Sequence, residues 1–207
     1  MRNAVGFYWT LPVPWAGFIE LPNDIDAAAK ASRTIRYQCE LIRRHAKERK
    51  LELVAEKVFL EIAPDRGSRH VLDGLRPLEA ICRAKKAVLL YVDFSEVQGW
   101  RGHGPLSDWE RRTGIEVEAV YPDMIQIDGE PFDPHRHFGE WRERQHAWTA
   151  GKEERVARAV DAAGRLRAAG RTYKDIADML NSDGVRSASG KPWSEDGIRD
   201  LLKKAKR

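Results

Sequence analysis

Residues 171–200 read RTYKDIADMLNSDGVRSASGKPWSEDGIRD, a stretch that predicts two short helices joined by a loop rich in Gly and Ser. Thr172 followed by Asp175 in the first turn is the signature of a helix N-terminus, and Gly184 marks the end of that helix. Ser194 is the expected N-cap of the second helix. The stretch therefore predicts a capped helix, a turn and a second capped helix.

A helix before this stretch is expected to complete a small apolar core. Apolar residues recur on one face of each of the three helices, and Trp193 stands just before the last one. The predicted core residues are Val156, Val160, Leu166, Ile176, Ala177, Leu180, Trp193, Ile198, Leu201 and Leu202. Three short helices around one core form a compact helix-turn-helix module, whose last helix can enter the major groove of DNA.

Positive charge is concentrated at the same end of the chain. The net charge is +4; residues 151–207 hold 14 Lys and Arg against 9 Asp and Glu, whereas residues 1–150 hold 22 against 23. Such an asymmetry is expected of a chain that meets a polyanion, although a solvated basic tail has the same charge. We therefore expect double-stranded DNA as the partner, with a three-helix module that binds protein as an alternative.

The expected DNA contacts come from polar residues of this module. Lys and Arg on the outer side of the last helix would bind phosphates, while groups near its start and in the preceding loop would read bases. The predicted DNA-binding residues are Arg171, Lys174, Arg186, Ser187, Lys191, Ser194, Arg199, Lys203 and Lys204.

The first 136 residues alternate between strand-like and helical patterns. The predicted strands are residues 4–11, 51–62, 87–94 and 115–121. The predicted helices are residues 24–50, 71–86 and 106–112, and residues 122–136 are rich in turn-forming residues. This alternation predicts an α/β domain with a mostly parallel sheet flanked by helices.

Residues 137–169 lack proline and are rich in Arg, Glu and Ala, which predicts either one long helix or two helices broken near Gly151. The expected organisation is an α/β domain (1–136), a connecting and dimerisation helix (137–169) and the helix-turn-helix module (155–207).

The composition is that of a soluble protein without a membrane segment. Charged residues make up 33% of the chain and hydrophobic residues 42%, and no apolar run is long enough for a membrane helix. The N-terminal MRNAVGFYWTLPVPW predicts a strand, because it lacks the cleavage site of a signal peptide. Cys39 and Cys82 are expected to be reduced thiols, with a disulfide as the alternative. A cytoplasmic, nucleoid-associated location is expected.

The run GRTYKDIADMLNSDGVRSASGKPWSEDGIRDLLKK resembles the recombinase-type DNA-binding segment of serine recombinases, the family of resolvases, invertases and large serine integrases. The matching residues are Gly170, Ile176, Ala177, Leu180, Asn181, Gly184, Gly190, Lys191, Trp193 and Ser194. More loosely, AVGFYWTL, Gln38 with Ile42, LVAEKVFLEI, PDRGSRHVLDGL and AVLLYVDF follow the order of that family's catalytic domain. The resemblance implies a resolvase-like fold and a homodimer or higher oligomer.

The resemblance also implies an active site, in which a serine hydroxyl attacks a DNA phosphate and arginines stabilise the charge, with no metal or other cofactor. In this chain Trp9 stands at the arginine position and Leu11 at the serine position. After Asp93, Phe94 occupies the place of another arginine. The remaining arginine candidates are Arg66, Arg69 and Arg101. The expectation is a catalytic domain that no longer cleaves DNA and serves a regulatory, architectural or accessory role.

Other hypotheses remain open at this point. An active recombinase would need a displaced nucleophile, for which Ser32 within the predicted helix and Ser95 are the candidates. The histidines His103, His135, His137 and His146 lack the spacing of a metal site. No Gly-rich phosphate loop follows the first strand, which argues against a nucleotide-binding fold. The aromatic residues Phe7, Tyr8, Trp9, Trp15 and Phe18 fit a core or a surface for a protein partner better than a surface for bases.

Overall fold

The computed structural model of the chain describes residues 2–62, 68–98 and 103–205. The chain divides into two compact units. Unit 1 comprises Met1–Pro12 and Glu20–Trp141, and unit 2 comprises Val13–Ile19 and Arg142–Arg207. The short segment Val13–Ile19 therefore belongs to the C-terminal unit, although it follows the first strand in sequence.

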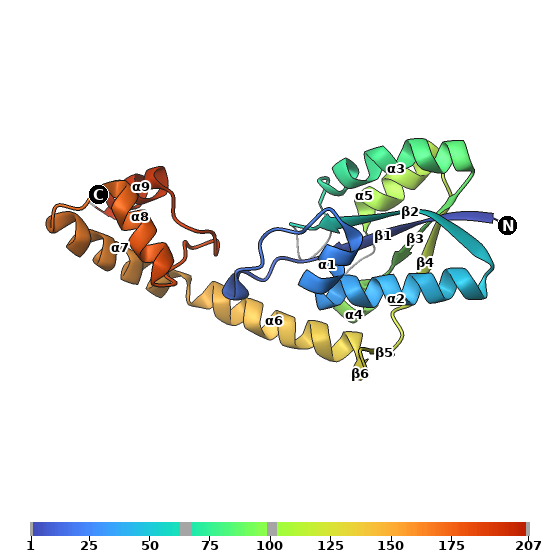
Figure 1. The fold of residues 1–207 in the computed structure, drawn as a ribbon, viewed down its shortest axis with the longest axis horizontal. Helices are drawn as coiled ribbons and strands as arrows, with labels where there is room; N and C mark the ends of the chain where they lie inside the picture. The colour runs from blue at the N-terminus through green and yellow to red at the C-terminus, as the bar shows by residue number, and fades with distance from the viewer. Residues whose placement is uncertain (1, 63–67, 99–102, 206–207) are drawn as a thin grey trace. The chain divides into compact units, whose positions relative to one another are not determined.

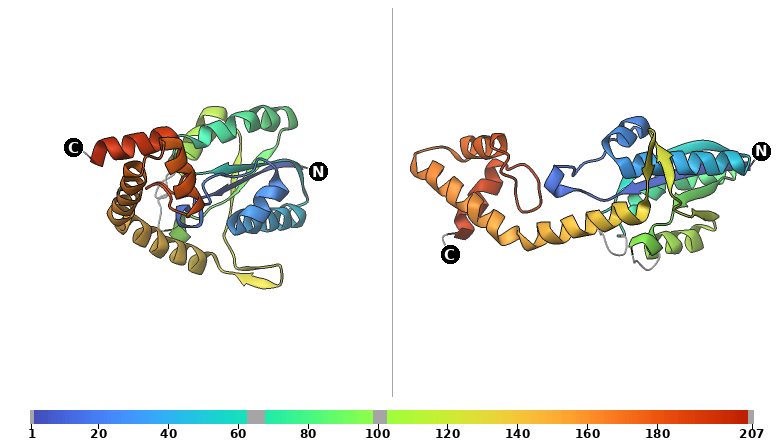
Figure 2. Two further views of the ribbon diagram at one scale, coloured as in Figure 1. Left: turned by 60° about the vertical axis from the view of Figure 1, so that its left-hand side comes forward. Right: turned by 90° about the horizontal axis from the view of Figure 1, so that it is seen from below.

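Unit 1 contains a four-stranded parallel sheet with helices on both faces (Figures 1 and 2). The strands of this sheet are β1 (Arg2–Thr10), β2 (Leu51–Leu60), β3 (Val88–Val92) and β4 (Val117–Val120). The helices of this unit are α1 (Ile25–Ala31), α2 (Arg33–Glu48), α3 (Val71–Lys85), α4 (Ser95–Gln98) and α5 (Gly104–Thr113). The prediction of a mostly parallel sheet flanked by helices is confirmed.

The strand order is β2-β1-β3-β4, so that β1 is central and pairs with β2 and β3. From Ala4 onward β1 is almost completely buried, because its two faces are covered by α2 and α3. Such a strand carries apolar residues on both faces, which is why its sequence is an unbroken apolar run. The chain reverses its direction of winding between β1 and β3, and ligands of open α/β sheets commonly bind at that point.

Ser32 interrupts the helix that was predicted over residues 24–50. Its backbone is extended, with φ −134° and ψ 117°, and its hydroxyl accepts a hydrogen bond from the Ile35 amide at 3.3 Å. Ser32 is therefore the N-cap of α2 and ends α1, and the prediction that it lies within a helix was wrong. The apolar spacing continues across the break, so periodicity alone did not reveal it.

Residues 122–136, which the sequence shows to be rich in turn-forming residues, also contain regular structure. They contain an antiparallel hairpin of β5 (Ile125–Ile127) and β6 (Glu130–Phe132), followed by the start of α6 (Pro134–Ala150). Asp128 and Gly129 form its two-residue turn, both with positive φ. An Asp-Gly pair between short apolar runs is a hairpin signal, and it would have identified this element.

Tyr8 of β1, Glu56 of β2 and Arg43 of α2 form a partly buried polar cluster. The Tyr8 hydroxyl donates to Glu56 Oε1 at 2.5 Å, and Arg43 binds the same carboxylate through two nitrogens at 2.9 and 3.0 Å. Burial would raise the pKa of Glu56, but the hydrogen bonds from Arg43 and Tyr8 lower it overall. Burial and the bond to Glu56 raise the pKa of Tyr8. The cluster links α2 and both neighbouring strands through a charged hydrogen-bond network.

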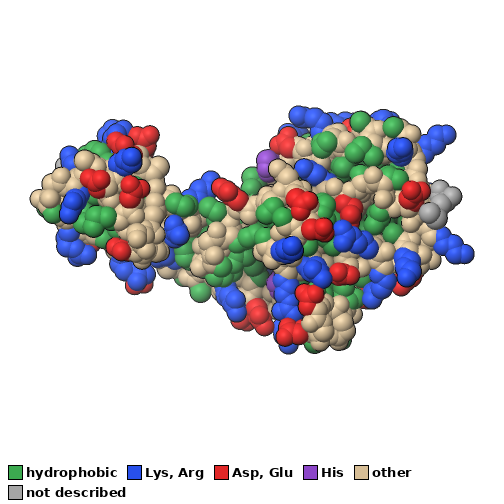
Figure 3. Space-filling view, viewed as in Figure 1, with side chains coloured by type: hydrophobic (Ala, Val, Ile, Leu, Met, Phe, Trp, Pro, Cys, Tyr) green, Lys and Arg blue, Asp and Glu red, His purple; other side chains and the backbone are tan. Residues whose placement is uncertain are grey.

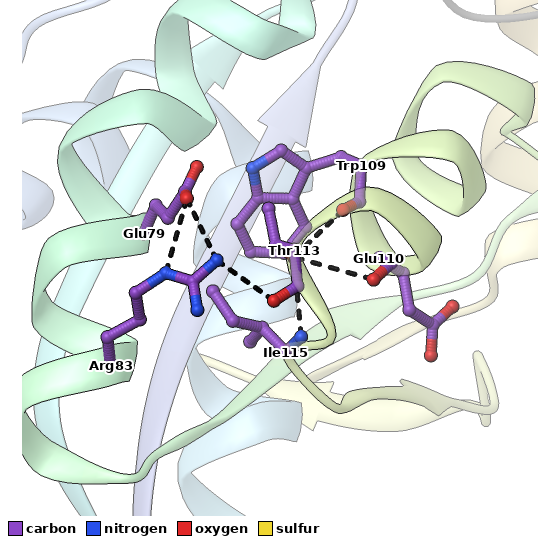
Figure 4. Close-up of polar contacts among 6 residues, drawn as sticks. All are labelled: Glu79, Arg83, Trp109, Glu110, Thr113 and Ile115. Carbon is purple, nitrogen blue, oxygen red and sulfur yellow. Dashed lines mark hydrogen bonds and ion pairs between the residues drawn. The ribbon is translucent and has the colours of Figure 1, made fainter.

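Helices α3 and α5 are joined on their face of the sheet by a polar contact (Figure 4). Arg83 of α3 donates to the Thr113 carbonyl oxygen at 2.9 Å and pairs with Glu79 at 3.2 Å. The Thr113 hydroxyl donates to the Trp109 carbonyl oxygen at 2.8 Å. These bonds fix the C-terminal end of α5, whose Trp109 side chain is buried in the core.

Unit 2 contains the end of α6 and three further helices, α7 (Lys152–Ala168), α8 (Tyr173–Ser182) and α9 (Glu195–Ala205). The helical stretch predicted at 137–169 is thus divided at Gly151, which corresponds to the second of the two alternatives. In the same unit, the bonded pair Val13 and Phe18 encloses a short 3-10 turn at Pro14–Ala16.

Cys39 and Cys82 are both buried free thiols, and burial raises the pKa of Cys39 to about 12. Among the helices that the structure describes, none combines the length and apolar character required to cross a bilayer.

Candidate functional site

Helices α7, α8 and α9 pack together as a three-helix module, and α8 begins as the sequence predicts. The Thr172 hydroxyl accepts from the Asp175 amide at 3.1 Å, while the Asp175 carboxylate accepts from the Thr172 amide at 3.2 Å. These bonds form a reciprocal capping box and lower the pKa of Asp175. Ser194 caps α9, because its hydroxyl accepts from the Gly197 amide at 3.1 Å.

The core of the three-helix module is small and consists mainly of the predicted residues. Ile176, Leu180 and Ile198 are almost completely buried, with Leu166, Trp193, Leu201 and Leu202 packed around them. From α7, however, Ala162 and Ala163 join this core in place of the predicted Val156 and Val160. The small alanine side chains let α7 approach α8 and α9 closely, a signal that a search for large apolar residues misses.

Asn181 fixes the two ends of the loop between α8 and α9. Its side-chain amide donates to the Trp193 carbonyl oxygen at 2.9 Å and accepts from the Trp193 amide at 2.7 Å. The end of α8 is thereby tied to the residue just before the Ser194 cap. Asn181 and Trp193, which both match the recombinase-type segment in sequence, thus form one hydrogen-bonded pair.

Most of the predicted DNA-binding residues lie on the surface of the three-helix module. Those classed as exposed are Arg171, Lys174, Lys191, Ser194, Arg199, Lys203 and Lys204, whereas Arg186 and Ser187 are half-buried. Acidic residues are interspersed with the basic ones on the face seen in Figure 3. Charge on this unit is therefore distributed, and no large purely cationic surface is visible from that side.

Arg199 is partly neutralised within its own helix. Its guanidinium pairs with Glu195 at 3.0 Å and Asp196 at 2.7 Å, and lies 5.5 Å from the Tyr173 ring centroid. Lys203 and Lys204, one turn further along α9, make no ion pair with the described residues. These two lysines are the more available cations for a phosphate backbone.

In unit 1, the residues that the resemblance to serine recombinases aligned with catalytic positions are part of the hydrophobic core. Trp9, Leu11 and Phe94 are 7%, 3% and 1% exposed. The Trp9 indole packs edge-on against Phe94 at 5.5 Å and donates to the Val92 carbonyl oxygen at 3.4 Å. These side chains fill the carboxyl end of the sheet.

A small cavity remains beside them, and its described lining is mostly apolar and aromatic. Its polar lining residues are Glu61, Asp93, Ser95 and His103, and no described arginine lines it. The Ser95 amide donates to Asp93 Oδ1 at 2.9 Å, so the candidate nucleophile lies beside a carboxylate. A carboxylate next to the serine would repel a DNA phosphate that approached it.

Glu61 and His103 form a buried pair that the sequence analysis missed. Glu61 is 1% exposed, and its Oε2 atom lies 3.2 Å from His103 Nε2. The same carboxylate accepts from the amides of Ile62 at 2.7 Å and Ser68 at 3.1 Å, and His103 Nδ1 accepts from the Leu106 amide at 3.3 Å. Because both ring nitrogens are engaged, this pair fixes loop ends and caps α5. No local pattern connects two residues so far apart.

The remaining predicted residues lie apart from this cavity or cannot be placed. Arg66 and Arg101 lie outside the described residues, and Arg69 is exposed in the turn before α3. His137 contacts the Thr34 hydroxyl at 3.0 Å. Within residues 2–62, 68–98 and 103–205, no three His, Cys, Asp or Glu side chains are grouped as metal ligands would be.

Comparison with known proteins shows a similarity in the C-terminal part of the chain. Neither the search of curated proteins nor the search of solved structures found a match. The family model named Recombinase matches residues 154–206, which comprise almost all of α7 together with α8 and α9. This match supports membership of a recombinase family and a function connected with DNA recombination.

Proposed function

We propose that this chain is a DNA-binding protein built on the plan of the serine recombinases that no longer cleaves DNA. Its three-helix module would act as a helix-turn-helix, and its α/β domain would be a resolvase-like scaffold. The role would be regulatory, architectural or accessory. The observation that carries the proposal is the Recombinase match over residues 154–206, together with core residues Trp9, Leu11 and Phe94 at the catalytic positions.

The orientation of α9 supports DNA binding through its exposed side. Ile198, Leu201 and Leu202 face the core of the three-helix module, which leaves Lys203 and Lys204 in solvent. In a helix-turn-helix protein, the helix after the turn enters the major groove and cations nearby bind phosphates. Arg171 and Lys174, at the start of α8, are exposed and would add phosphate contacts. A homodimer on two half-sites would follow the recombinase plan.

Replacing both Lys203 and Lys204 with alanine is expected to weaken binding to a DNA duplex about tenfold or more at low salt. Each phosphate contact removed should also reduce the slope of log affinity against log salt by about 0.9. Fluorescence anisotropy with a labelled duplex, repeated across a salt series, measures both effects.

The matched control is the double variant Lys30→Ala with Lys47→Ala, which removes two exposed lysines from unit 1. This control should bind as the wild type does. A wild-type chain without measurable duplex affinity at low salt would contradict DNA binding and favour a module that binds protein.

The loss of cleavage is tested with a suicide DNA substrate, in which a nicked site traps a covalent intermediate. We expect no protein–DNA adduct on a denaturing gel, because no serine occupies the Leu11 position and Ser95 lies beside Asp93. An adduct that disappears in Ser95→Ala or Ser32→Ala, but not in Ser107→Ala, would overturn the proposal and establish an active recombinase.

A further inference from the structure

A cavity of about 480 Å3 lies within unit 2, between the three-helix module and the segment Val13–Ile19. Pockets of 300–1,000 Å3 are typical of sites for small ligands. Its apolar lining includes Trp15 and Trp148, and its charged lining consists of Arg155, Arg158 and Arg186. No acidic residue is among its described lining.

The wall formed by Pro14 depends on a glycine in the loop before α9. A methyl group built on Gly190 would lie 2.6 Å from Pro14 Cβ and 2.8 Å from the Pro14 carbonyl oxygen. Gly190 also has a φ of +81°, in a tight turn where its amide donates to the Ser187 carbonyl oxygen at 2.9 Å. The segment Val13–Ile19 is thus fitted closely against this loop, and the cavity it encloses is a defined feature of unit 2.

The Arg155 guanidinium stacks on an indole ring, and two of its nitrogens lack a hydrogen-bond partner among the described residues. Its guanidinium carbon lies 3.5 Å from the centroid of the Trp148 ring. Its Nε and Nη2 atoms are buried and have no hydrogen-bond partner among the described residues. Buried N–H groups without an acceptor are costly, and an anion bound by this side chain would supply acceptors.

The other two arginines add positive charge without a strong competing partner. Arg158 pairs with Glu154 only at 3.8 Å, and both side chains are largely exposed. Arg186 makes no ion pair with a described residue and is half-buried at the cavity wall. Two indole-bearing and three arginine residues therefore line one cavity.

We propose that this cavity binds a nucleotide, with the base stacked on an indole or guanidinium plane and the phosphate held by the arginines. Aromatic rings and arginine planes are the usual stacking surfaces for unpaired bases, and guanidiniums bind phosphate oxygens through paired hydrogen bonds. The choice of a nucleotide over another flat anion rests on the proposed function, since this unit carries the Recombinase match. The nucleotide is either free or an unpaired nucleotide of bound DNA.

The direct test is isothermal titration of the full chain with deoxyadenosine monophosphate. We expect a dissociation constant below about 1 mM. Deoxyadenosine alone and inorganic phosphate alone should each bind at least tenfold more weakly. Deoxyadenosine can make only the stacking contacts, and phosphate can make only the contacts to the arginines. Absence of binding by the monophosphate, or equal binding by phosphate alone, would overturn the proposal.

Variants locate the site. Trp148→Ala and Arg186→Ala should each weaken binding of the monophosphate about fivefold or more. Arg165→Ala is the matched control, since Arg165 is an exposed arginine of α7 that does not line the cavity. Gly190→Ala should also weaken binding, by displacing Pro14. Gly170→Ala controls for strain, because Gly170 has the same φ of +81° with nothing near its Cβ position. Unchanged affinity in Trp148→Ala and Arg186→Ala would place any binding elsewhere and refute the assignment.

Two duplexes then identify the source of the nucleotide. If it comes from DNA, a duplex with one bulged nucleotide should bind at least fivefold more tightly than the fully paired duplex, and Trp148→Ala should remove that preference. Equal binding to both duplexes would assign the cavity to a free nucleotide. Failure to bind either duplex, with binding of the monophosphate retained, would refute the proposed function and leave the cavity assignment intact.

Discussion

Replacing Ile198 with aspartate is expected to unfold the three-helix module and abolish DNA binding while unit 1 stays folded. Ile198 has no exposed surface in a core of very few side chains. A core of this size supplies only about 3–5 kcal/mol of net stability. An isolated carboxylate there would have to be desolvated or protonated, at a cost that exceeds this margin.

Hydrogen exchange followed by mass spectrometry separates the two units in one experiment. Peptides from α8 and α9 should lose protection, whereas peptides from β1 and β3 should keep it. Met179→Asp is the matched control, because Met179 lies on α8 and is 38% exposed. Retained protection of α8 and α9 in Ile198→Asp would mean that this core does not hold the three helices together.

Replacing Gly6 with alanine is expected to destabilise unit 1 by about 3 kcal/mol or more. The added methyl group would lie 2.5 Å from the Tyr8 hydroxyl oxygen and 2.8 Å from the ring carbon that bears it. Tyr8 is completely buried and cannot move into solvent. The substitution therefore combines overpacking, which costs about 1–3 kcal/mol, with loss of the bond to Glu56, worth about 1.5–3 kcal/mol.

A double-mutant cycle with Tyr8→Phe tests this cause. Removing the hydroxyl relieves the closest contact, so the cost of Gly6→Ala should fall by about 1 kcal/mol or more in the Tyr8→Phe background. Gly139→Ala, in a helix with nothing near its Cβ position, should be neutral or slightly stabilising. Denaturant-dependent hydrogen exchange of β1 and β2 reports the free energies. If the free-energy costs of Gly6→Ala and Tyr8→Phe were strictly additive, the clash with the Tyr8 hydroxyl would not be the cause of the destabilisation.

The sequence predicted the elements that depend on local signals. The strand pattern identified β1, β2, β3 and β4, since buried parallel strands are apolar on both faces. Capping residues identified where α8 and α9 begin, because Thr172 and Ser194 each accept a hydrogen bond from the amide three residues further on. The apolar character of Trp9 and Leu11 was also visible in the sequence, and the structure places both side chains in the core.

Features that depend on distant residues were not predictable from one sequence. Glu61 and His103 meet only because the ends of β2 and of the loop before α5 are adjacent in the fold. The segment Val13–Ile19 joins unit 2, where Pro14 lies against Gly190, although residues Glu20–Trp141 of unit 1 separate it from the rest of unit 2 in sequence. The sequence alone therefore predicts that Trp15 lies in a core or on a surface for a protein partner. Nothing in the sequence indicates a cavity beside it.

The two hydrogen bonds between the Asn181 side chain and the Trp193 backbone form a clamp across the turn from α8 to α9. A turn usually both holds its flanking helices in place and presents its own residues to a partner, and here the clamp performs the first of these roles. Because the clamp sets the spacing of the flanking helices, exposed loop residues such as Ser189 are free to change without altering how those helices are presented. Val185 and Gly190 are not, since Val185 packs against the module core and Gly190 lies against Pro14. Changes at the exposed loop residues could therefore alter which DNA sequence is bound, while α8 and α9 keep their arrangement.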